Sequence, residues 1–161
     1  MENNLKELKK ERMKGRGEFS MLVAVDGSDY SRVVAKEAAK VASEKKADVV
    51  LLSIVPVPSL APSEGEIDEA YLKEQETALE KLHNELIDKF FKPGSGALIE
   101  SKVLHGSPAD KIIHYAREMD ADLIVVGTRG RGRVASTLLG SVSQHVVNHS
   151  GRSVLIVKSE T

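Results

Sequence analysis

At 161 residues the chain has the size of one domain and can bury a core without disulfides or metal ions. A net charge of −1 argues against a general polyanion binder, and the lack of cysteine excludes disulfides, thiol nucleophiles and thiolate metal sites. The apolar runs are strand-sized and the N-terminus is charged. We therefore expect a cytoplasmic protein, without a membrane span or a secretory signal.

Strand-like and helix-like patterns alternate from the first apolar run onward. Residues 21–25 are apolar and stop at Asp26-Gly27-Ser28, which predicts a buried strand followed by a turn. Ser28 or Asp29 can cap a helix that runs to about Lys46, because apolar residues recur there at helical spacing. Those apolar positions are Val33, Val34, Ala38, Val41 and Ala42.

A second strand and a long helix are expected next. Residues 49–55 are apolar apart from Ser53, and three prolines between residues 56 and 62 then exclude regular strand pairing. An amphipathic pattern from about Gly65 to Phe91 predicts a helix, which ends at the Pro-Gly-Ser-Gly sequence of residues 93–96. The expected apolar stripe of this helix contains Tyr71, Ala78, Leu82, Leu86 and Phe90.

The second half of the chain repeats the alternation. A more polar run at residues 99–104 predicts a strand nearer an edge of the sheet. Ser107-Pro108 then starts a helix, with serine placed to cap it and proline tolerated in its first turn. That helix carries Ile112, Ile113, Tyr115, Ala116 and Met119. A fourth strand at residues 123–126, a last helix from Ser136 to about Asn148 and a strand at residues 154–157 complete the pattern.

Five apolar strands that alternate with four helices predict a single doubly wound α/β domain with a parallel sheet. Strands that are apolar throughout fit a sheet with helices on both faces. In such folds, ligands bind outside the carboxyl ends of the strands, where the strand order reverses. Turns with small or charged residues follow the first strand, at Asp26-Gly27-Ser28, and the fourth, from Gly127 onward. If these strands are neighbours, the two turns share one crevice.

The connection after the fourth strand is rich in glycine and arginine. It contains Gly127, Gly130, Gly132 and Gly140, followed by Ser141 and a helical pattern. Glycines let a backbone approach an anion closely, and the N–H groups at a helix N-terminus point at its charge. This segment therefore favours a phosphate-binding loop.

Three interpretations of this loop compete. It can be an ordinary tight turn. It can bind a dinucleotide, since residues 130–135 match G-x-G-x-x-A, but the acidic ribose ligand expected about 20 residues later would fall at Ser150-Gly151. It can also bind a mononucleotide, although not through a Walker A loop, because the chain has no G-x-x-x-x-G-K-[ST] string.

The spacing Gly127-x2-Gly130-x9-Gly140-Ser141 resembles the nucleotide-binding signature of the ATP-binding branch of the universal stress protein family. The resemblance covers about residues 19–159. It includes the segments 23–28, 105–108, 138–143 and 153–157.

The resemblance implies a sheet in the strand order 3-2-1-4-5 with ATP at its carboxyl edge. By position, Asp26 is expected at the base or ribose beside Val25, and Ile54 is expected to present its backbone to adenine. Val126 and Gly127 are expected to line the ribose. The residues expected to bind the phosphates through N–H and hydroxyl donors are Gly130, Gly140, Ser141, Val142 and Ser143.

Two of these assignments have alternatives. Arg129 and Arg131, and less so Arg133, can contact the phosphates, or they can remain solvated loop residues. Asp26 can bind the ligand, or it can cap the following helix and form the turn.

We expect neither catalytic residues nor a metal site built by the protein. His145 and His149 are spaced i, i+4, as in some zinc sites, but such a pair also occurs on ordinary polar helix faces. Mg²⁺ or Mn²⁺ is instead expected to bind mainly to the phosphates of ATP. With no cysteine and no G-x-S-x-G motif, any activity is expected to be slow ATP hydrolysis at most.

Residues 1–18 carry many charges and are expected to form a mobile arm, or a docking tail, before a nucleotide-binding domain at residues 19–161. In the family's strand order, residues 154–157 form an apolar edge strand that pairs with its copy. The resemblance thus implies a homodimer through Val154–Val157. The alternative is a monomer in which Lys158 to Thr161 cover the edge.

Two classes of function follow. The first is an ATP-binding regulatory or stress-response protein of the universal stress type. The second is a dimeric interaction module of the same fold that does not use ATP. A third class, an enzyme that adenylates a substrate, lacks a recognisable acceptor site in the sequence. No nucleic acid or membrane partner is expected.

Overall fold

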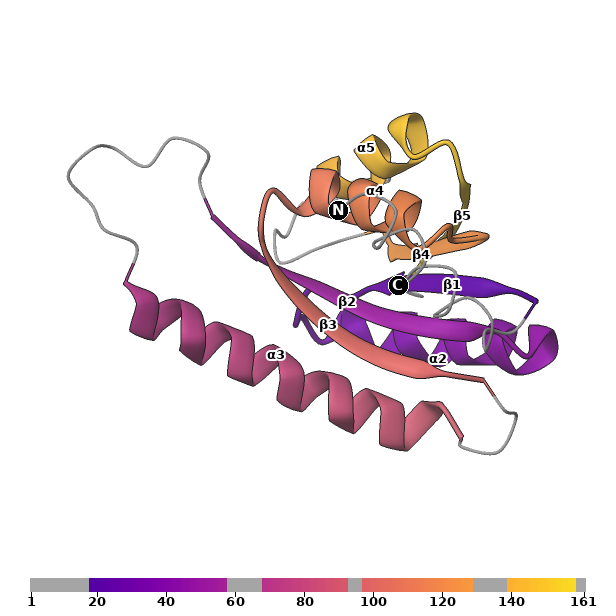
Figure 1. Ribbon diagram of the computed structural model, residues 1–161, viewed down its shortest axis with the longest axis horizontal. Helices are drawn as coiled ribbons and strands as arrows, with labels where there is room; N and C mark the ends of the chain where they lie inside the picture. Colours follow the sequence, from indigo (N-terminus) through magenta and orange to yellow (C-terminus); the bar gives the residue numbers. More distant parts are fainter. Residues whose placement is uncertain (1–17, 58–67, 93–96, 129–138, 159–161) are drawn as a thin grey trace, which may run out of the picture.

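Strands and helices alternate along the described parts of the chain, residues 18–57, 68–92, 97–128 and 139–158, in the computed structural model (Figure 1). In chain order they are β1 (Ser20–Ala24), α2 (Tyr30–Lys45), β2 (Asp48–Pro56), α3 (Glu69–Phe90), β3 (Ile99–Gly106), α4 (Pro108–Glu118), β4 (Leu123–Gly127), α5 (Ser141–His149) and β5 (Ser153–Val157).

The strands form one parallel sheet in the order β3-β2-β1-β4-β5. β1 lies at the centre, where Val23 is in register with Leu51 of β2 on one side and with Val125 of β4 on the other. The doubly wound α/β fold and the strand order are therefore confirmed. The more polar strand β3 lies at one edge, as predicted, and β5 lies at the other.

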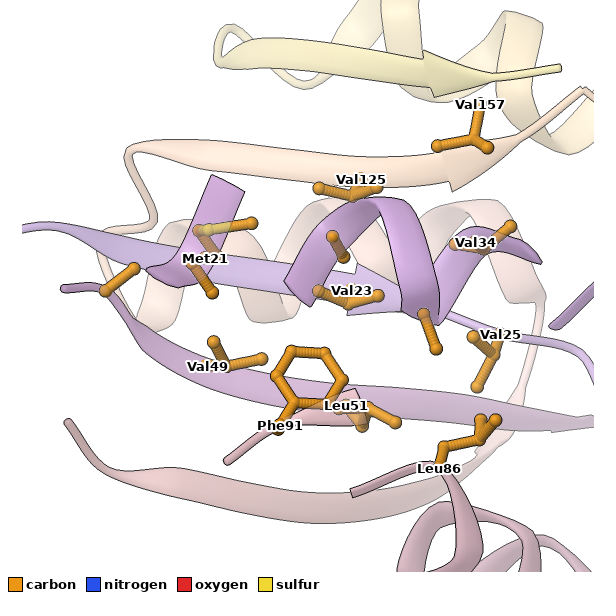
Figure 2. Close-up of a cluster of buried hydrophobic side chains, with 14 residues drawn as sticks. Met21, Val23, Val25, Val34, Val49, Leu51, Leu86, Phe91, Val125 and Val157 are labelled. Carbon is orange, nitrogen blue, oxygen red and sulfur yellow. The ribbon is translucent and has the colours of Figure 1, made fainter. Parts of the chain in front are cut away.

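Helices α2 and α3 cover one face of the sheet, and α4 and α5 cover the other (Figure 1). Side chains alternate across a strand, so Met21 and Val23 pack toward α2 while Leu22 packs toward α4. Figure 2 shows the first of these two apolar clusters. Each large apolar side chain buried in this way contributes roughly 1.5–3 kcal/mol, which explains why the central strands are apolar throughout.

Helix α2 begins directly after Asp29, one of its two predicted caps, and ends where the sequence predicts. Asp29 is at the N-cap position, yet its side chain makes no capping hydrogen bond. Lys46 adopts the left-handed conformation and terminates the helix. The predicted apolar stripe includes Val33, which is instead 38% exposed. The buried stripe runs through Val34, Ala35, Ala38 and Ala42.

Helix α3 follows the predicted stripe only in its C-terminal half, where Leu86 is buried and Leu82 and Phe90 pack against the core. Asp68 caps it by accepting a hydrogen bond from the backbone N–H of Ala70 at 2.9 Å, so the described helix begins after Asp68 rather than near Gly65. Its buried residues are Leu79, His83 and Leu86, whereas Tyr71 and Ala78 are exposed. The N-terminal half differs because the polar residue His83 lies at the centre of the buried stripe. No helix within the described ranges is both long enough and apolar enough to cross a membrane.

Two further boundaries and one expected cap differ from the sequence predictions. β2 continues through Pro56, which is in register with Gly106 at the end of β3. Ser107 precedes α4 but makes no side-chain capping hydrogen bond, while Pro108 occupies the first turn as expected. The last helix begins at Ser141 instead of Ser136, since Gly140 is extended, with φ −62° and ψ 159°.

Candidate functional site

The turn after β1 and the loop after β4 follow the carboxyl ends of two neighbouring parallel strands, so both lie at the same end of the sheet. This is the point at which the strand order reverses, because the chain passes from β1 to β2 on one side and reaches β4 on the other. A crevice at such a point is where doubly wound proteins bind ligands. The adjacency that the crevice prediction requires is therefore present.

Asp26 uses one carboxylate oxygen to shape the turn. Its Oδ1 accepts hydrogen bonds from the backbone N–H of Ser28 at 3.0 Å and from the Ser28 hydroxyl at 2.6 Å. The hydroxyl of Ser31 lies 3.4 Å from the same oxygen and accepts the N–H of Gly27 at 3.1 Å. Asp26 thus takes part in the turn, as one of the two interpretations predicts.

The other oxygen of Asp26 is different. Oδ2 is buried and has no hydrogen-bond partner among the described residues. A buried polar atom without a partner costs roughly 1–3 kcal/mol, so Oδ2 at the carboxyl end of β1 calls for a donor from beyond the described residues, such as a bound ligand. A sugar hydroxyl or the amino group of a base would supply such a donor, as the ligand-binding interpretation of Asp26 expects.

Gly127 ends β4 and is required by packing. A Cβ atom at this position would lie 2.7 Å from the ring of Tyr30. The ring cannot move away easily, because the Tyr30 hydroxyl donates a hydrogen bond to the carbonyl of Val157 at 2.6 Å. Gly127 is therefore needed for the contact between α2 and the sheet, whatever contact it makes with a ligand.

The two described ends of the loop between β4 and α5 are hydrogen-bonded to each other. The N–H of Gly140 donates to the carbonyl of Thr128 at 2.9 Å, and the N–H of Thr128 donates to Val157 at 3.0 Å. These bonds fix the N-terminus of α5 beside the carboxyl end of β4. Arg129, Gly130, Arg131 and Arg133 lie outside the described residues.

The N-terminus of α5 has the properties of an anion site. Ser141 and Val142 are exposed in its first turn, where backbone N–H groups have no partner within the helix. The partial positive charge of the helix dipole lies at the same point. Ser143 is buried, and its hydroxyl donates to the carbonyl of Gly140 at 3.1 Å, so this hydroxyl stabilises the helix start.

Val25, Ile54 and Val126 are buried near the carboxyl ends of three adjacent strands. Ile54 also lines a hollow of about 150 Å³ between the end of β2 and the first turns of α3. The other residues that line it are Val55, Pro56, Tyr71, Gln75 and Leu79. Ile54 therefore lies beside a hollow at the carboxyl end of β2.

A buried polar group that was not predicted from the sequence lies next to the carboxyl end of β2. His83 of α3 is completely buried, and its ring nitrogens contact the hydroxyls of Ser53 at 2.8 Å and Ser101 at 2.7 Å. Burial lowers the pKa of His83 from an ordinary 6.5 to about 4. The one available signal was Ser53, a lone polar residue within an apolar strand.

The histidine pair on α5 forms a stacked surface pair. The rings of His145 and His149 are stacked with their centroids 4.2 Å apart, and His145 lies 3.5 Å from the carboxylate of Asp110. Across the described ranges, no group of three histidine or acidic side chains is arranged to hold a metal ion.

Residues 20–158 match the universal stress protein family. The chain is 35% identical to a universal stress protein of Methanocaldococcus jannaschii over 86% of this chain and 81% of that protein. It is 40% identical to a universal stress protein of Thermus aquaticus over 86% of this chain and 98% of the relative. The chain belongs to the universal stress protein family.

Solved structures of this family share the fold. The universal stress protein UspA from Lactobacillus plantarum aligns with a TM-score of 0.72 at 22% identity, over 88% of this chain and 98% of that one. A universal stress protein in complex with cAMP aligns at 0.63 and 26% identity, over 88% and 98%. One from Archaeoglobus fulgidus in complex with dAMP aligns at 0.58 and 27% identity, over 87% and 98%.

Proposed function

We propose that the protein is an ATP-binding universal stress protein that acts as a nucleotide-dependent regulatory or stress-response protein in the cytoplasm, where ATP is available. Hydrolysis of ATP is at most slow in this proposal, and Mg²⁺ or Mn²⁺ binds mainly to the phosphates. The observation that carries the proposal is the buried Oδ2 of Asp26, which has no hydrogen-bond partner among the residues that the structure describes.

The rest of the crevice supports the same ligand. A nucleotide has a hydrogen-bond donor at its ribose or base and negative charge at its phosphates. Asp26 offers an acceptor at the end of β1, and α5 begins beside the end of the neighbouring strand β4. Two related proteins were solved with adenine nucleotides, cAMP and dAMP, which share adenine, ribose and phosphate with ATP.

In this proposal Asp26 accepts a hydrogen bond from the ribose or the base, with Val25, Ile54, Val126 and Gly127 around it. The phosphates bind at Gly140 and the first turn of α5, where N–H groups and the helix dipole favour negative charge. Ser141, Val142 and Ser143 belong to this phosphate site, Ser143 through its backbone N–H alone, because its hydroxyl donates to the carbonyl of Gly140. Arg129, Gly130 and Arg131 stay assigned to it from the sequence.

The test of this proposal is a substitution that keeps the Asp26 oxygen in the turn and replaces the oxygen assigned to the ligand. In Asp26→Asn, the amide oxygen can still accept from Ser28, but an NH₂ group replaces Oδ2, which has no partner in the described part of the chain. We expect the Kd for Mg-ATP, measured by calorimetry, to rise about tenfold or more while the melting temperature changes little. Asp29→Asn removes an exposed charge three residues away and is the matched control.

Mass spectrometry of small molecules released from the denatured wild-type protein complements the titration. ATP or ADP in near-stoichiometric amount supports the proposal. An empty protein that also fails to bind added Mg-ATP would contradict it and leave the dimeric interaction module as the better hypothesis. Asp26→Asn is a cleaner probe than a substitution of Gly127, because Gly127 is required by the packing of Tyr30.

A homodimer through Val154–Val157 is also part of the proposal. β5 is an edge strand, and Val154, Leu155 and Ile156 are only partly buried. An uncovered apolar edge favours pairing with another strand. Sedimentation equilibrium at micromolar concentration is expected to give twice the mass of one chain, and a monomeric mass would contradict this assembly.

A further inference from the structure

A chain of side-chain hydrogen bonds crosses the α2–α3 face of the sheet and ends at the residue before Asp26. Ser101 of β3 contacts Nδ1 of His83, Nε2 of His83 contacts Ser53 of β2, and Ser53 contacts the carbonyl of Val25 at 2.6 Å. His83 and Ser53 are almost fully buried. Two polar side chains thus lie inside an otherwise apolar layer. Their hydrogen bonds connect β3 to Val25, at the carboxyl end of β1 where the candidate site lies.

The direction of each hydrogen bond follows from counting hydrogens. The carbonyl of Val25 can only accept, so the single hydroxyl hydrogen of Ser53 points to it. Ser53 must then accept from His83, which places the ring hydrogen on Nε2. Nδ1 has no hydrogen in the neutral ring and accepts from the hydroxyl of Ser101. A neutral His83 with its hydrogen on Nε2 satisfies all three contacts.

These contacts fix Val25 on both sides. β1 ends at Ala24, and the N–H of Val25 donates to the carbonyl of Leu52 at 3.0 Å. Its carbonyl accepts from the side chain of Ser53. The peptide group between Val25 and Asp26 therefore takes its orientation from Ser53, and Ser53 takes its orientation from His83.

We propose that His83 is a positioning residue for the nucleotide site: by donating from Nε2 to Ser53 it orients the Val25–Asp26 peptide group and directs Oδ2 of Asp26 toward the ligand. This inference rests on the proposed function. It adds a residue outside the crevice, on a helix that supplies none of the ligand contacts assigned above.

Two neutral substitutions of His83 separate positioning from packing. The side-chain amide of glutamine reaches the place of Nε2 and can donate to Ser53, whereas the shorter amide of asparagine reaches the place of Nδ1 and Ser101. We expect His83→Gln to bind Mg-ATP within about twofold of wild type, and His83→Asn to bind about tenfold more weakly. Ser53→Ala is expected to match His83→Asn and serves if the latter does not fold.

A control and a spectroscopic measurement complete the test. Thr77→Ala removes an exposed hydroxyl from the same helix, where it donates to the carbonyl of Lys73, and is expected to leave the affinity unchanged. Nitrogen-15 NMR of wild-type His83 is expected to show the Nε2–H tautomer at neutral pH. The carbonyl carbon resonance of Val25 is expected to shift in Ser53→Ala and His83→Asn, but much less in His83→Gln.

The outcomes distinguish this inference from the proposed function. If the wild-type protein binds Mg-ATP and His83→Gln, His83→Asn and Ser53→Ala all bind it as tightly as wild type, the positioning role is overturned and the proposed function stands. An Nδ1–H tautomer would also overturn it. Wild-type protein that binds no nucleotide would overturn the proposed function, and this role with it.

Discussion

The two halves of the candidate site are built in different ways. The Asp26 turn is fixed by side chains, since its carboxylate holds Ser28 and the preceding peptide group is hydrogen-bonded to Ser53. The start of α5 is fixed by the backbone, through the bond from Gly140 to Thr128, and exposes N–H groups in its first turn. One half thus depends on particular buried side chains, and the other depends mainly on helix geometry.

This difference gives each half its own sensitivity. Substitution or titration of a buried polar residue should disturb the Asp26 half, because an unpaired polar group or a charge is costly in an apolar layer. The α5 half should tolerate neutral substitutions in its first turn and respond to charge, because backbone N–H groups and the helix dipole create its potential.

The largest expected effect is a loss of stability at acidic pH through His83. The ring has a pKa of about 4 in the folded protein and near 6.5 when unfolded, and its two partners are uncharged hydroxyls. Between these values the unfolded chain binds more protons. The free energy of unfolding should therefore fall as the pH drops from 6.5 toward 4, by about 3 kcal/mol at most.

Urea unfolding of the wild type and His83→Gln at about pH 7 and about pH 4.5 measures this contribution. The stability difference between the two proteins should shift in favour of the variant at the lower pH, since glutamine does not titrate. An identical pH dependence in both proteins would contradict the assignment of a buried neutral histidine.

A smaller loss of stability is expected from a substitution at Gly127, which lies between the two halves of the site. Gly127→Ala places a methyl group against the Tyr30 ring and should destabilise the protein by roughly 1–3 kcal/mol in urea unfolding. In the double variant with Tyr30→Ala, the combined loss should be smaller than the sum of the two single losses. Strict additivity would show that the ring and Gly127 are not in contact.

A substitution at the start of α5 tests whether this half of the site responds to charge, as the Asp26 half responds to its buried side chains. Ser141→Asp is expected to raise the Kd for Mg-ATP about thirtyfold through repulsion of the phosphates, and to leave the affinity for adenosine nearly unchanged. The melting temperature should stay equal or rise slightly, because a negative charge favours a helix N-terminus. Ser141→Asn is the neutral control, and unchanged ATP affinity in Ser141→Asp would place the phosphates elsewhere.

The sequence predicts features that depend on local pattern. The apolar runs at residues 21–25 and 123–126 locate two strands to within about one residue of β1 and β4. Alternation of strands and helices fixes the α/β class, and the strand order came from the family resemblance. The Asp26 turn was recognisable because a left-handed backbone conformation, as at Gly27 with φ +84°, favours glycine.

Features that depend on distant partners were not predictable in this way. His83 looks like a polar interruption of α3 until the fold brings Ser53 and Ser101 from two strands to its ring nitrogens. Gly127 looks like a ligand contact alone until Tyr30 is seen against it. The helix start at Ser141 depends on the bond between Gly140 and Thr128, whose partners are separated by the loop.

The most direct test of the account is an NMR titration of the wild-type protein with Mg-ATP, following the backbone amides of both halves. We expect the resonances of Asp26 and Gly27 and those of Ser141 and Val142 to shift together with one Kd, because a single nucleotide spans both halves. Shifts confined to one half, or none at either, would contradict a nucleotide site between the Asp26 turn and the start of α5.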